Sequence, residues 1–579
     1  MAVTPPSDSE LAAIAERYGL GLGPADIAGY RELIAGALTS YDEVERLYAA
    51  RAPELPPARS WQHPAEADNE LGAWYVTTSI TSAASEGSGP AGPLAGRRVA
   101  VKDNIAVAGV PMMNGSATVE GFIPRRDATV VTRLLDAGAT IAGKAVCEEL
   151  CFDGGSHTAH TGPVRNPWDP SKSAGGSSSG SAALIASGAV DMALGGDQAG
   201  SIRIPASFCG VVGHKPTHGL VPYTGAFPIE NTIDHLGPIT RTVRDAAVML
   251  GVLAGPDGFD PRQRLLPEPS PDYVAGLSGG VEGLRIGVLR EGFGIPGASS
   301  PSVDAAVQAA VDRLSSLGAA VTSVSVPAHR DAVHLWTVIG TDGAFGQMLE
   351  GNGYGMNVPG LYDPELIEHF ARGRAAHGAG MSVTLKMTTL LGRYNLDRHG
   401  NRYYAMARNL ILDLAAAYDS ALSGVDVLVM PTLPVTAFDM PSGRASAEEV
   451  MAISAGLMLN TCPFDLTGHP ATSVPAELPD GLPGRLPVGL MIVGRQFEDG
   501  TCLRVAQAYE SAVGGFPSPP RLPPATRSPR QAPEVATSAA TRAGGCHLGC
   551  HFSHSDLLTF CLYAYRQVTS SLRPLCWLF

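Results

Sequence analysis

A forty-residue stretch, residues 174–213, constrains the fold of this chain more than any other feature. Its sequence is AGGSSSGSAALIASGAVDMALGGDQAGSIRIPASFCGVVG, which contains nine glycines and seven serines. The pattern predicts a helix over SAALIASG directly after a Gly/Ser loop, a strand over VDMALGG, and a tight turn at GDQAGS. One helix and one strand would therefore bring two serine-bearing loops together, and the backbone N–H groups of such turns are natural donors to anions.

Elsewhere in the chain, short apolar runs alternate with helical patterns. A helix is expected over 127–138, and strands are expected over 97–104, 139–146, 190–196, 284–289, 319–326, 425–432 and 487–494. Such alternation is typical of layered folds that contain both helices and strands. We therefore expect an α/β fold in which helices flank the core, a mixed β-sheet.

Shifts in composition divide the chain into four regions. Helical spacing of apolar residues over 8–50, followed by the linker SEGSGPAGP, marks off the first region, and a Pro-rich stretch followed by a Cys-rich stretch marks the last. The expected regions are a helical N-terminal segment (1–90), a core (91–302 and 421–516), an inserted smaller helical subdomain (303–420), and a disordered or unrelated C-terminal extension (517–579).

Charge and hydropathy exclude several classes of partner. The 579 residues carry a net charge of −14 and no long basic stripe, so we expect no nucleic-acid partner. No apolar run reaches the ~18 residues that span a bilayer, so we expect no membrane partner. The first residues, MAVTPPSDSE, lack the basic start and apolar stretch of a signal peptide, and a cytoplasmic protein is expected.

Three motifs together resemble the amidase signature family of serine hydrolases. The stretch above is similar to that family's G-G-S-S-x-G-S followed by D-x-G-G-S-I-R-x-P, and VAVKDN supplies a lysine, Lys102, at the end of an upstream strand. The spacing also agrees, with 75 residues from Lys102 to Ser177 and 24 from Ser177 to Ser201. The resemblance runs from about residue 10 to about 515. It implies the amidase signature fold.

Within this family, the motifs look most like those of bacterial enantioselective amidases, which hydrolyse small aliphatic or aromatic amides and are linked to nitrile metabolism. The helical N-terminus resembles the one that helps to form a homodimer in that subgroup. The resemblance therefore implies a small-molecule amide substrate and a homodimer. It implies neither a metal nor an organic cofactor.

The resemblance also assigns roles to the three motif residues. Ser201 is the expected nucleophile, Ser177 the proton relay and Lys102 the base, with a cis peptide bond between Gly176 and Ser177. Splitting amide hydrolysis into acylation and deacylation through an acyl-enzyme makes each step easier. A lysine serves as a base only when neutral, and burial in a low-dielectric site favours the neutral amine.

Two further sets of residues follow from the resemblance. The backbone N–H groups of Gln198, Ala199 and Gly200 are expected to form the oxyanion hole. Ala199 stands where the family has glycine, and because a Cβ disfavours positive φ, the geometry of this loop depends on that residue. Cys151 and Phe152 match the position where the acyl group and the leaving amide are bound, and the apolar Phe152 favours alkyl or aryl substrates.

Alternatives remain open at this point. A glutamine-dependent amidotransferase A-type subunit, or a carbamate or anilide hydrolase, shares the same three residues. Ser178 formally lies at the centre of G-x-S-x-G, the nucleophile elbow of α/β-hydrolases, but no buried strand is expected before it. Cys546, His547, Cys550, His551 and His554 are potential zinc ligands by residue type, with a spacing that is only weakly typical of a zinc site.

Overall fold

The computed structural model describes residues 3–51, 58–82, 91–263, 266, 271–441, 446–477 and 486–520. These residues belong to two compact units, of which one comprises Met1–Ala58 and the other begins at Arg59. The cysteines and histidines of the C-terminal extension lie outside the described residues. In the part of the chain that is described, no helix combines the length and the apolar character needed to cross a membrane.

The first unit is a pair of helices, α1 (Asp8–Arg17) and α2 (Pro24–Ala50). Ser7 caps α1 in a capping box with Glu10, and Pro24 begins α2, so both N-termini carry residues that favour a helix start. Arg31 of α2 forms an ion pair with Asp8 of α1 at 2.9 Å. The helices expected over 8–50 are therefore present.

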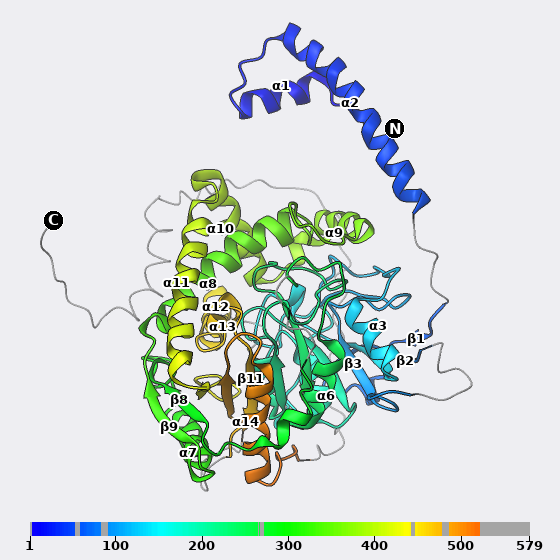
Figure 1. Ribbon diagram of the computed structural model, residues 1–579. Coiled ribbons are helices and arrows are strands. Elements are labelled where there is room, and N and C mark those ends of the chain that lie inside the picture. Colours follow the sequence, from blue (N-terminus) through cyan, green and yellow to red (C-terminus); the bar gives the residue numbers. More distant parts are fainter. Residues whose placement is uncertain are drawn as a thin grey trace, which may run out of the picture. The chain divides into compact units, whose positions relative to one another are not determined.

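A twelve-stranded sheet forms the core of the second unit (Figure 1). In spatial order its strands are β1 (Trp61–Gln62), β2 (Trp74–Ile80), β4 (Thr140–Ala145), β3 (Arg98–Lys102), β5 (Met192–Asp197), β7 (His235–Thr240), β6 (Val212–Lys215), β11 (Ala471–Pro475), β12 (Gly489–Val493), β10 (Val427–Pro431), β8 (Arg285–Leu289) and β9 (Ala320–Val324).

The sheet is mixed. Strand β3 runs parallel to β4 and β5, and β8 runs parallel to β9 and β10. The remaining neighbours pair antiparallel. Every residue of β5, β7, β10, β11 and β12 is buried, as expected for strands covered on both faces. The expected α/β architecture with a mixed sheet is confirmed.

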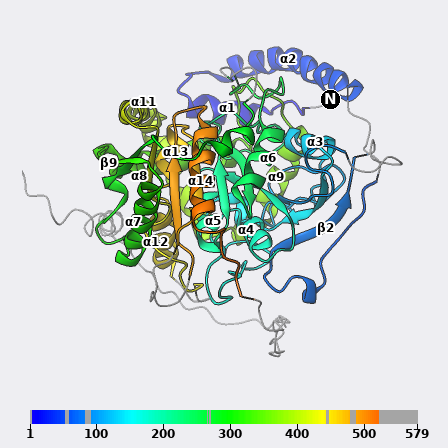
Figure 2. The same cartoon turned by 60° about the horizontal axis from the view of Figure 1, so that its bottom comes forward.

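Helices pack along this sheet. They are α3 (Thr129–Asp136), α4 (Ser179–Ala186), α5 (Arg203–Cys209), α6 (Val243–Leu253), α7 (Pro301–Ser316), α8 (Ala332–Val338), α9 (Pro364–His377), α10 (Val383–His399), α11 (Arg402–Gly424), α12 (Ala447–Leu457), α13 (Cys462–Leu466) and α14 (Asp499–Ala512). Helix α14 packs against α6, α7 and β11, and lies in front of the sheet in Figure 2.

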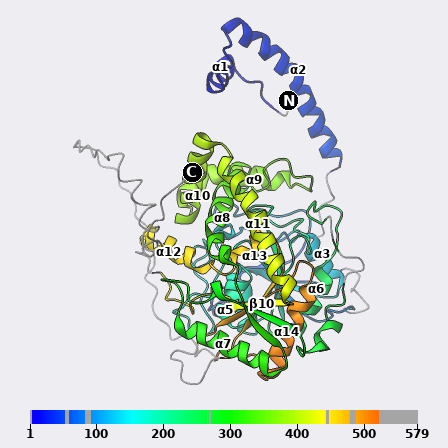
Figure 3. The same cartoon turned by 60° about the vertical axis from the view of Figure 1, so that its left-hand side comes forward.

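Helices α8 to α11 gather at one end of the second unit (Figures 1 and 3). Residues 303–420, expected as an inserted helical subdomain, also contribute most of α7 and the edge strand β9 to the sheet layer. Residues 61–80, within the segment expected to be helical, form β1 and β2. The sequence of β2, WYVTTSI, is aromatic and β-branched, which favours a strand.

Candidate active site

Parallel strands bring the lysine to the serine loops. Strand β3 ends at Lys102 and pairs in parallel with β5, with Val101 opposite Leu194. The carboxyl ends of both strands therefore meet at one edge of the sheet, where β5 leads through Asp197 into the loop that carries Ser201. The Gly/Ser loop before α4 reaches the same edge, and its Gly176–Ser177 peptide bond is cis, as expected.

Lys102 and Ser177 are in direct contact. The side-chain nitrogen of Lys102, Nζ, lies 2.8 Å from Ser177 Oγ and 3.2 Å from the carbonyl oxygen of Gly196. Both side chains are completely buried. Among the described residues, Lys102 has no carboxylate partner, whereas the neighbouring Lys144 pairs with Asp103 at 2.8 Å. Both of these hydrogen bonds of Lys102 go to neutral oxygens, and the Cys151 thiol also interacts with Lys102.

Ser201 lies beside this pair and is 5% exposed. The two serine loops are joined by a hydrogen bond from Ser178 N to the carbonyl oxygen of Ser201 at 3.3 Å. The Ser178 hydroxyl donates to the carbonyl of Gly196 and accepts from its N–H. Ser178 thus ties its loop to β5, and no strand precedes it as a nucleophile elbow would require.

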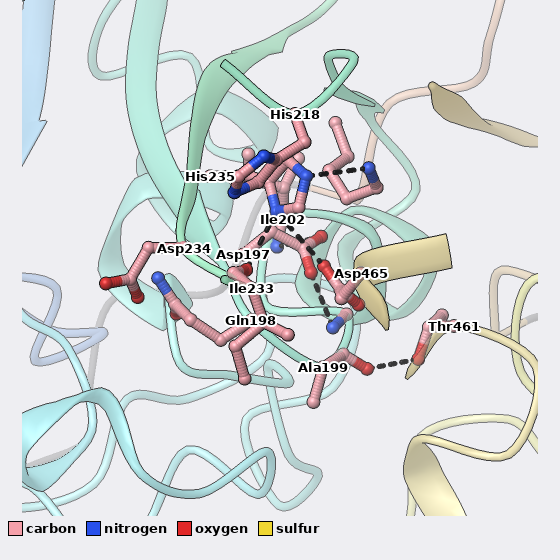
Figure 4. Close-up of polar contacts among 12 residues, drawn as sticks. Asp197, Gln198, Ala199, Ile202, His218, Ile233, Asp234, His235, Thr461 and Asp465 are labelled. Atoms are coloured by element: carbon pink, nitrogen blue, oxygen red, sulfur yellow. Dashed lines mark hydrogen bonds and ion pairs between the residues drawn. The ribbon is translucent and has the colours of Figure 1, made fainter. Parts of the chain in front are cut away.

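A buried charge network fixes the start of the Ser201 loop (Figure 4). The Asp197 carboxylate accepts from Gly200 N at 2.5 Å and Ile202 N at 3.0 Å, and Arg203 donates to it twice at 3.0 Å. Arg203 also donates to Asp465 at 2.7 Å. Burial raises the pKa of Asp197, but the charge and hydrogen bonds of Arg203 outweigh it and hold this pKa well below its usual range.

The residues expected to form the oxyanion hole differ in how their amides are used. The Gly200 N–H already donates to Asp197. The amides of Gln198 and Ala199 have no acceptor among the described residues. Ala199 does not adopt positive φ, so its Cβ is tolerated, whereas Gly200 has φ 132° and a Cβ there would collide with the Thr461 hydroxyl.

Cys151 and Phe152 also lie near the candidate site. Cys151 is buried with φ 58°, and its thiol lies 3.3 Å from Asn114 Oδ1. Burial raises the pKa of this thiol, but a hydrogen bond from Cys147 and the charge of Lys102 outweigh it and lower the pKa to about 7. The half-buried Phe152 ring lies 6.3 Å from the ring of Trp336, centroid to centroid.

A comparison with protein-family models matches residues 66–503 to the Amidase family. The match spans more than half of the chain and includes both serine loops and Lys102. The chain belongs to the amidase family. The fold seen here is the fold of that family, since the solved structures that it resembles are family members.

Similar proteins include an enantioselective amidase from Rhodococcus rhodochrous, which is 53% identical over 521 residues, 90% of this chain and 98% of that protein. The A-type subunit of the glutamyl-tRNA(Gln) amidotransferase from Methanosarcina mazei is 38% identical and is matched over 73% of this chain and 85% of its own length. The likeness to the Rhodococcus protein thus extends over more of the chain and at higher identity.

Two solved structures share the fold at 30% identity. The peptide amidase from Stenotrophomonas maltophilia has a TM-score of 0.61, covering 74% of this chain and 85% of that chain. The A-type subunit of the glutamyl-tRNA(Gln) amidotransferase from Thermotoga maritima has a TM-score of 0.64, covering 79% of this chain and 92% of that chain. The fold alone therefore does not separate an amidase from an amidotransferase.

Three residues of this amidase-family protein that contact the candidate site were not identified from the sequence. Trp336 of α8 donates through Nε1 to the carbonyl of Gln198 at 2.7 Å, and Tyr223 accepts from Gln198 Nε2 at 3.1 Å. The Thr461 hydroxyl donates to the carbonyl of Ala199 (Figure 4). Trp336 and Thr461 lie 138 and 262 residues from their partners, so no local spacing pointed to them.

Proposed function

We propose that this amidase hydrolyses small aliphatic or aromatic monocarboxylic amides to the carboxylic acid and ammonia through Ser201, Ser177 and Lys102. The observation that carries the proposal is the buried 2.8 Å contact between Lys102 Nζ and Ser177 Oγ, beside Ser201. This contact supports the part of a proton path that leads from Ser177 to the lysine base.

In the proposed acylation, neutral Lys102 accepts a proton from Ser177, which takes the proton of Ser201. Ser201 Oγ forms a bond to the amide carbon, and the carbonyl electrons move to oxygen. When the intermediate collapses, the C–N bond breaks and the proton returns through Ser177 to the leaving nitrogen, which departs as ammonia. The enzyme is left as an ester of Ser201.

Deacylation follows the reverse route. Water loses a proton to Ser177 and Lys102 and attacks the ester, and the proton then returns to Ser201 as the acid departs. The oxyanion of both steps would be held by the amides of Gln198 and Ala199, with Gly200 included if its N–H turns from Asp197. Loss of one such donor typically raises a barrier by about 2.7–4 kcal/mol.

The relatives support a stand-alone amidase over the amidotransferase alternative. The enantioselective amidase matches almost its whole length to this chain at 53% identity, against 38% identity for the amidotransferase relative. The contact between Phe152 and Trp336 supports an apolar acyl group, because aromatic side chains line pockets for alkyl and aryl substrates.

The proposal is tested by measuring ammonia release from short aliphatic, branched and aromatic amides, with glutamine in the same panel. Replacing Ser201 with alanine should reduce turnover of the best amide at least ~10⁴-fold, because the covalent route is lost. Ser187→Ala, at the end of α4, is the matched control and should retain turnover. Amide turnover that survives Ser201→Ala would contradict the assignment, and hydrolysis of glutamine alone would favour the amidotransferase.

We further infer that the enzyme is a cytoplasmic homodimer. The five described cysteines are all free thiols, which suits a reducing compartment. Apolar residues are exposed at helical spacing along α2, namely Tyr30, Leu33, Tyr41, Val44 and Tyr48, and such a stripe is typical of a helix that packs against a partner.

A further inference from the structure

Three potential metal ligands lie together in the loop after β4 and take no part in the proposed reaction. They are Glu148, Asp153 and His157. Each offers one ligand atom, a carboxylate oxygen or an imidazole nitrogen, and these atoms all lie within 4.8 Å of one another. The cluster adjoins the cis peptide, because Glu148 N donates to the carbonyl of Ser177 at 3.2 Å.

Several atoms of the cluster are buried without a hydrogen-bond partner. Glu148 is completely buried, and its Oε2 accepts from the backbone N–H and the hydroxyl of Thr158. Its other oxygen, Oε1, has no partner among the described residues, and neither ring nitrogen of His157 has one. Buried polar atoms are nearly always satisfied, so three unsatisfied atoms at one place indicate a missing ligand.

A cation fits the chemistry of this cluster. Two carboxylates and an imidazole supply lone pairs and negative charge but no fixed positive charge. Glu148 is completely buried, and its carboxylate lies beside a second one, that of Asp153. A bound cation would remove this unfavourable burial of negative charge.

We propose that Glu148, Asp153 and His157 bind one divalent cation of the Zn²⁺ class. Imidazole nitrogen favours zinc and similar borderline metals over Ca²⁺ and Mg²⁺, and both imidazole nitrogen and carboxylate oxygen are ligand types that zinc binds. Water would fill the fourth position. Bonds of about 2.0–2.2 Å hold tetrahedral ligands about 3.3–3.6 Å apart, so binding draws the three side chains together.

The surroundings of the carboxylates suit metal ligands. Asp153 Oδ1 accepts from the N–H groups of Gly154 and Gly155, and its Oδ2 accepts from Ser454 of α12 at 2.8 Å. Outer hydrogen bonds of this kind orient ligating carboxylates. They also connect the ion to α12.

The ion has a structural role next to Ser177. A Cβ on Gly176 would lie 2.8 Å from Glu148 Cγ, so the Glu148 side chain packs directly on the cis peptide. Fixing Glu148 therefore fixes the backbone that presents Ser177 to Lys102. The cation takes no step in amide hydrolysis.

The test uses the full-length protein, treated with a chelator, dialysed and titrated with Zn²⁺. The wild-type protein should bind one equivalent of Zn²⁺ more than His157→Ala binds. The midpoint of thermal unfolding of the wild-type protein should rise when Zn²⁺ is added. Asp153→Asn should lower the affinity of the same site for Zn²⁺ at least tenfold. This second variant provides the test if His157→Ala does not fold. His160→Ala, an exposed histidine in the same loop, is the matched control and should behave as wild type.

Cysteines and histidines elsewhere in the chain are the same in the wild-type protein and in the variants. Any Zn²⁺ that they bind is therefore the same in each protein, and the difference between the proteins reports on this site. Equal stoichiometry in wild type and in the folded variants would overturn the proposal. A thermal midpoint of wild type that does not respond to Zn²⁺ would also overturn it. Either result would indicate that a proton, rather than a metal ion, neutralises the cluster.

Discussion

At the scale of single residues, the loop that carries Ser201 depends on which position carries a side chain. Ala199 and Gly200 are neighbours, yet only Gly200 has positive φ, at 132°. The Cβ of Ala199 is therefore compatible with the loop. At Gly200 a Cβ would meet Thr461, which is the residue that holds the carbonyl of Ala199.

Gly200→Ala should therefore reduce amide turnover by at least ~10²-fold, because the loop must shift and the amides proposed to hold the oxyanion are displaced. Ala199→Gly is the matched control and should keep turnover within a few-fold of wild type. Steady-state kinetics on one good amide provides the measurement. Equal activity of the two variants would show that the loop relaxes around the added Cβ.

The three residues proposed for catalysis were chosen from the sequence because their motifs and spacing resemble those of the amidase signature family. Lys102 ends a strand, and Ser177 and Ser201 lie in Gly-rich loops. The supports Trp336 and Thr461 could not be found, since a hydrogen bond to a backbone carbonyl places no demand on nearby sequence.

At the scale of elements, Arg203 at the start of α5 connects β5 to α13. Its guanidinium lies between Asp197 and Asp465 and also donates to the carbonyl of Thr461 at 2.9 Å. All three charged side chains are completely buried. Removal of the guanidinium would leave these two buried carboxylates without their hydrogen-bonded cation, with only the longer-range charge of Lys215 near them.

Arg203→Met should thus lower the free energy of unfolding by about 3–5 kcal/mol, as measured by urea denaturation. Arg372→Met is the control, because its exposed pair with Glu368 on α9 should contribute less than about 1 kcal/mol. A loss of similar size in both variants would contradict the special role of the buried network.

A buried histidine joins α11 to the loop before α13. His329 Nδ1 lies 2.6 Å from the Tyr418 hydroxyl, and Nε2 lies 3.1 Å from Asn460 Oδ1. Asn460 Nδ2 already donates to two carbonyls, so Oδ1 is the acceptor and His329 carries its proton on Nε2. Burial lowers the pKa of His329 to about 4.

Because the unfolded chain binds this proton below about pH 6.5 and the folded protein only below about 4, stability should fall as pH drops through that window, by about 3 kcal/mol in all. His329→Gln should flatten this part of the pH profile of unfolding. His377→Gln, at an exposed site at the end of α9, should leave it unchanged. Parallel profiles for wild type and His329→Gln would contradict the prediction.

Several strands were not expected from the sequence, and β7 shows why. Its sequence, HLGPIT, contains glycine and proline, which normally weaken a strand. Strand β6 pairs with β7 only at Ile239 and Thr240, so Pro238 needs no N–H on that side. Strands such as β8, β10 and β12 were expected because they are continuous apolar runs.

At the scale of the whole molecule, the exposed stripe of α2 favours a second copy as its partner. Leu33 and Val44 are 70% and 65% exposed and lie on that stripe. Replacing both with glutamate should convert the proposed homodimer to a monomer, which halves the mass in sedimentation equilibrium, because charge would be buried in the interface. Glu32→Lys is the control. A wild-type monomer, or an unaltered dimer in the double variant, would contradict the prediction.

The strand order has a consequence for the nascent chain. Strands β11 and β12, which end at Val493, lie between β6 and β10 in the middle of the sheet. Lys102, Ser177 and Ser201 are all synthesised within the first 201 residues, but the sheet that holds them is continuous only after the last two strands have been inserted. The full sheet around the proposed triad can therefore form only after residue 493 has been synthesised.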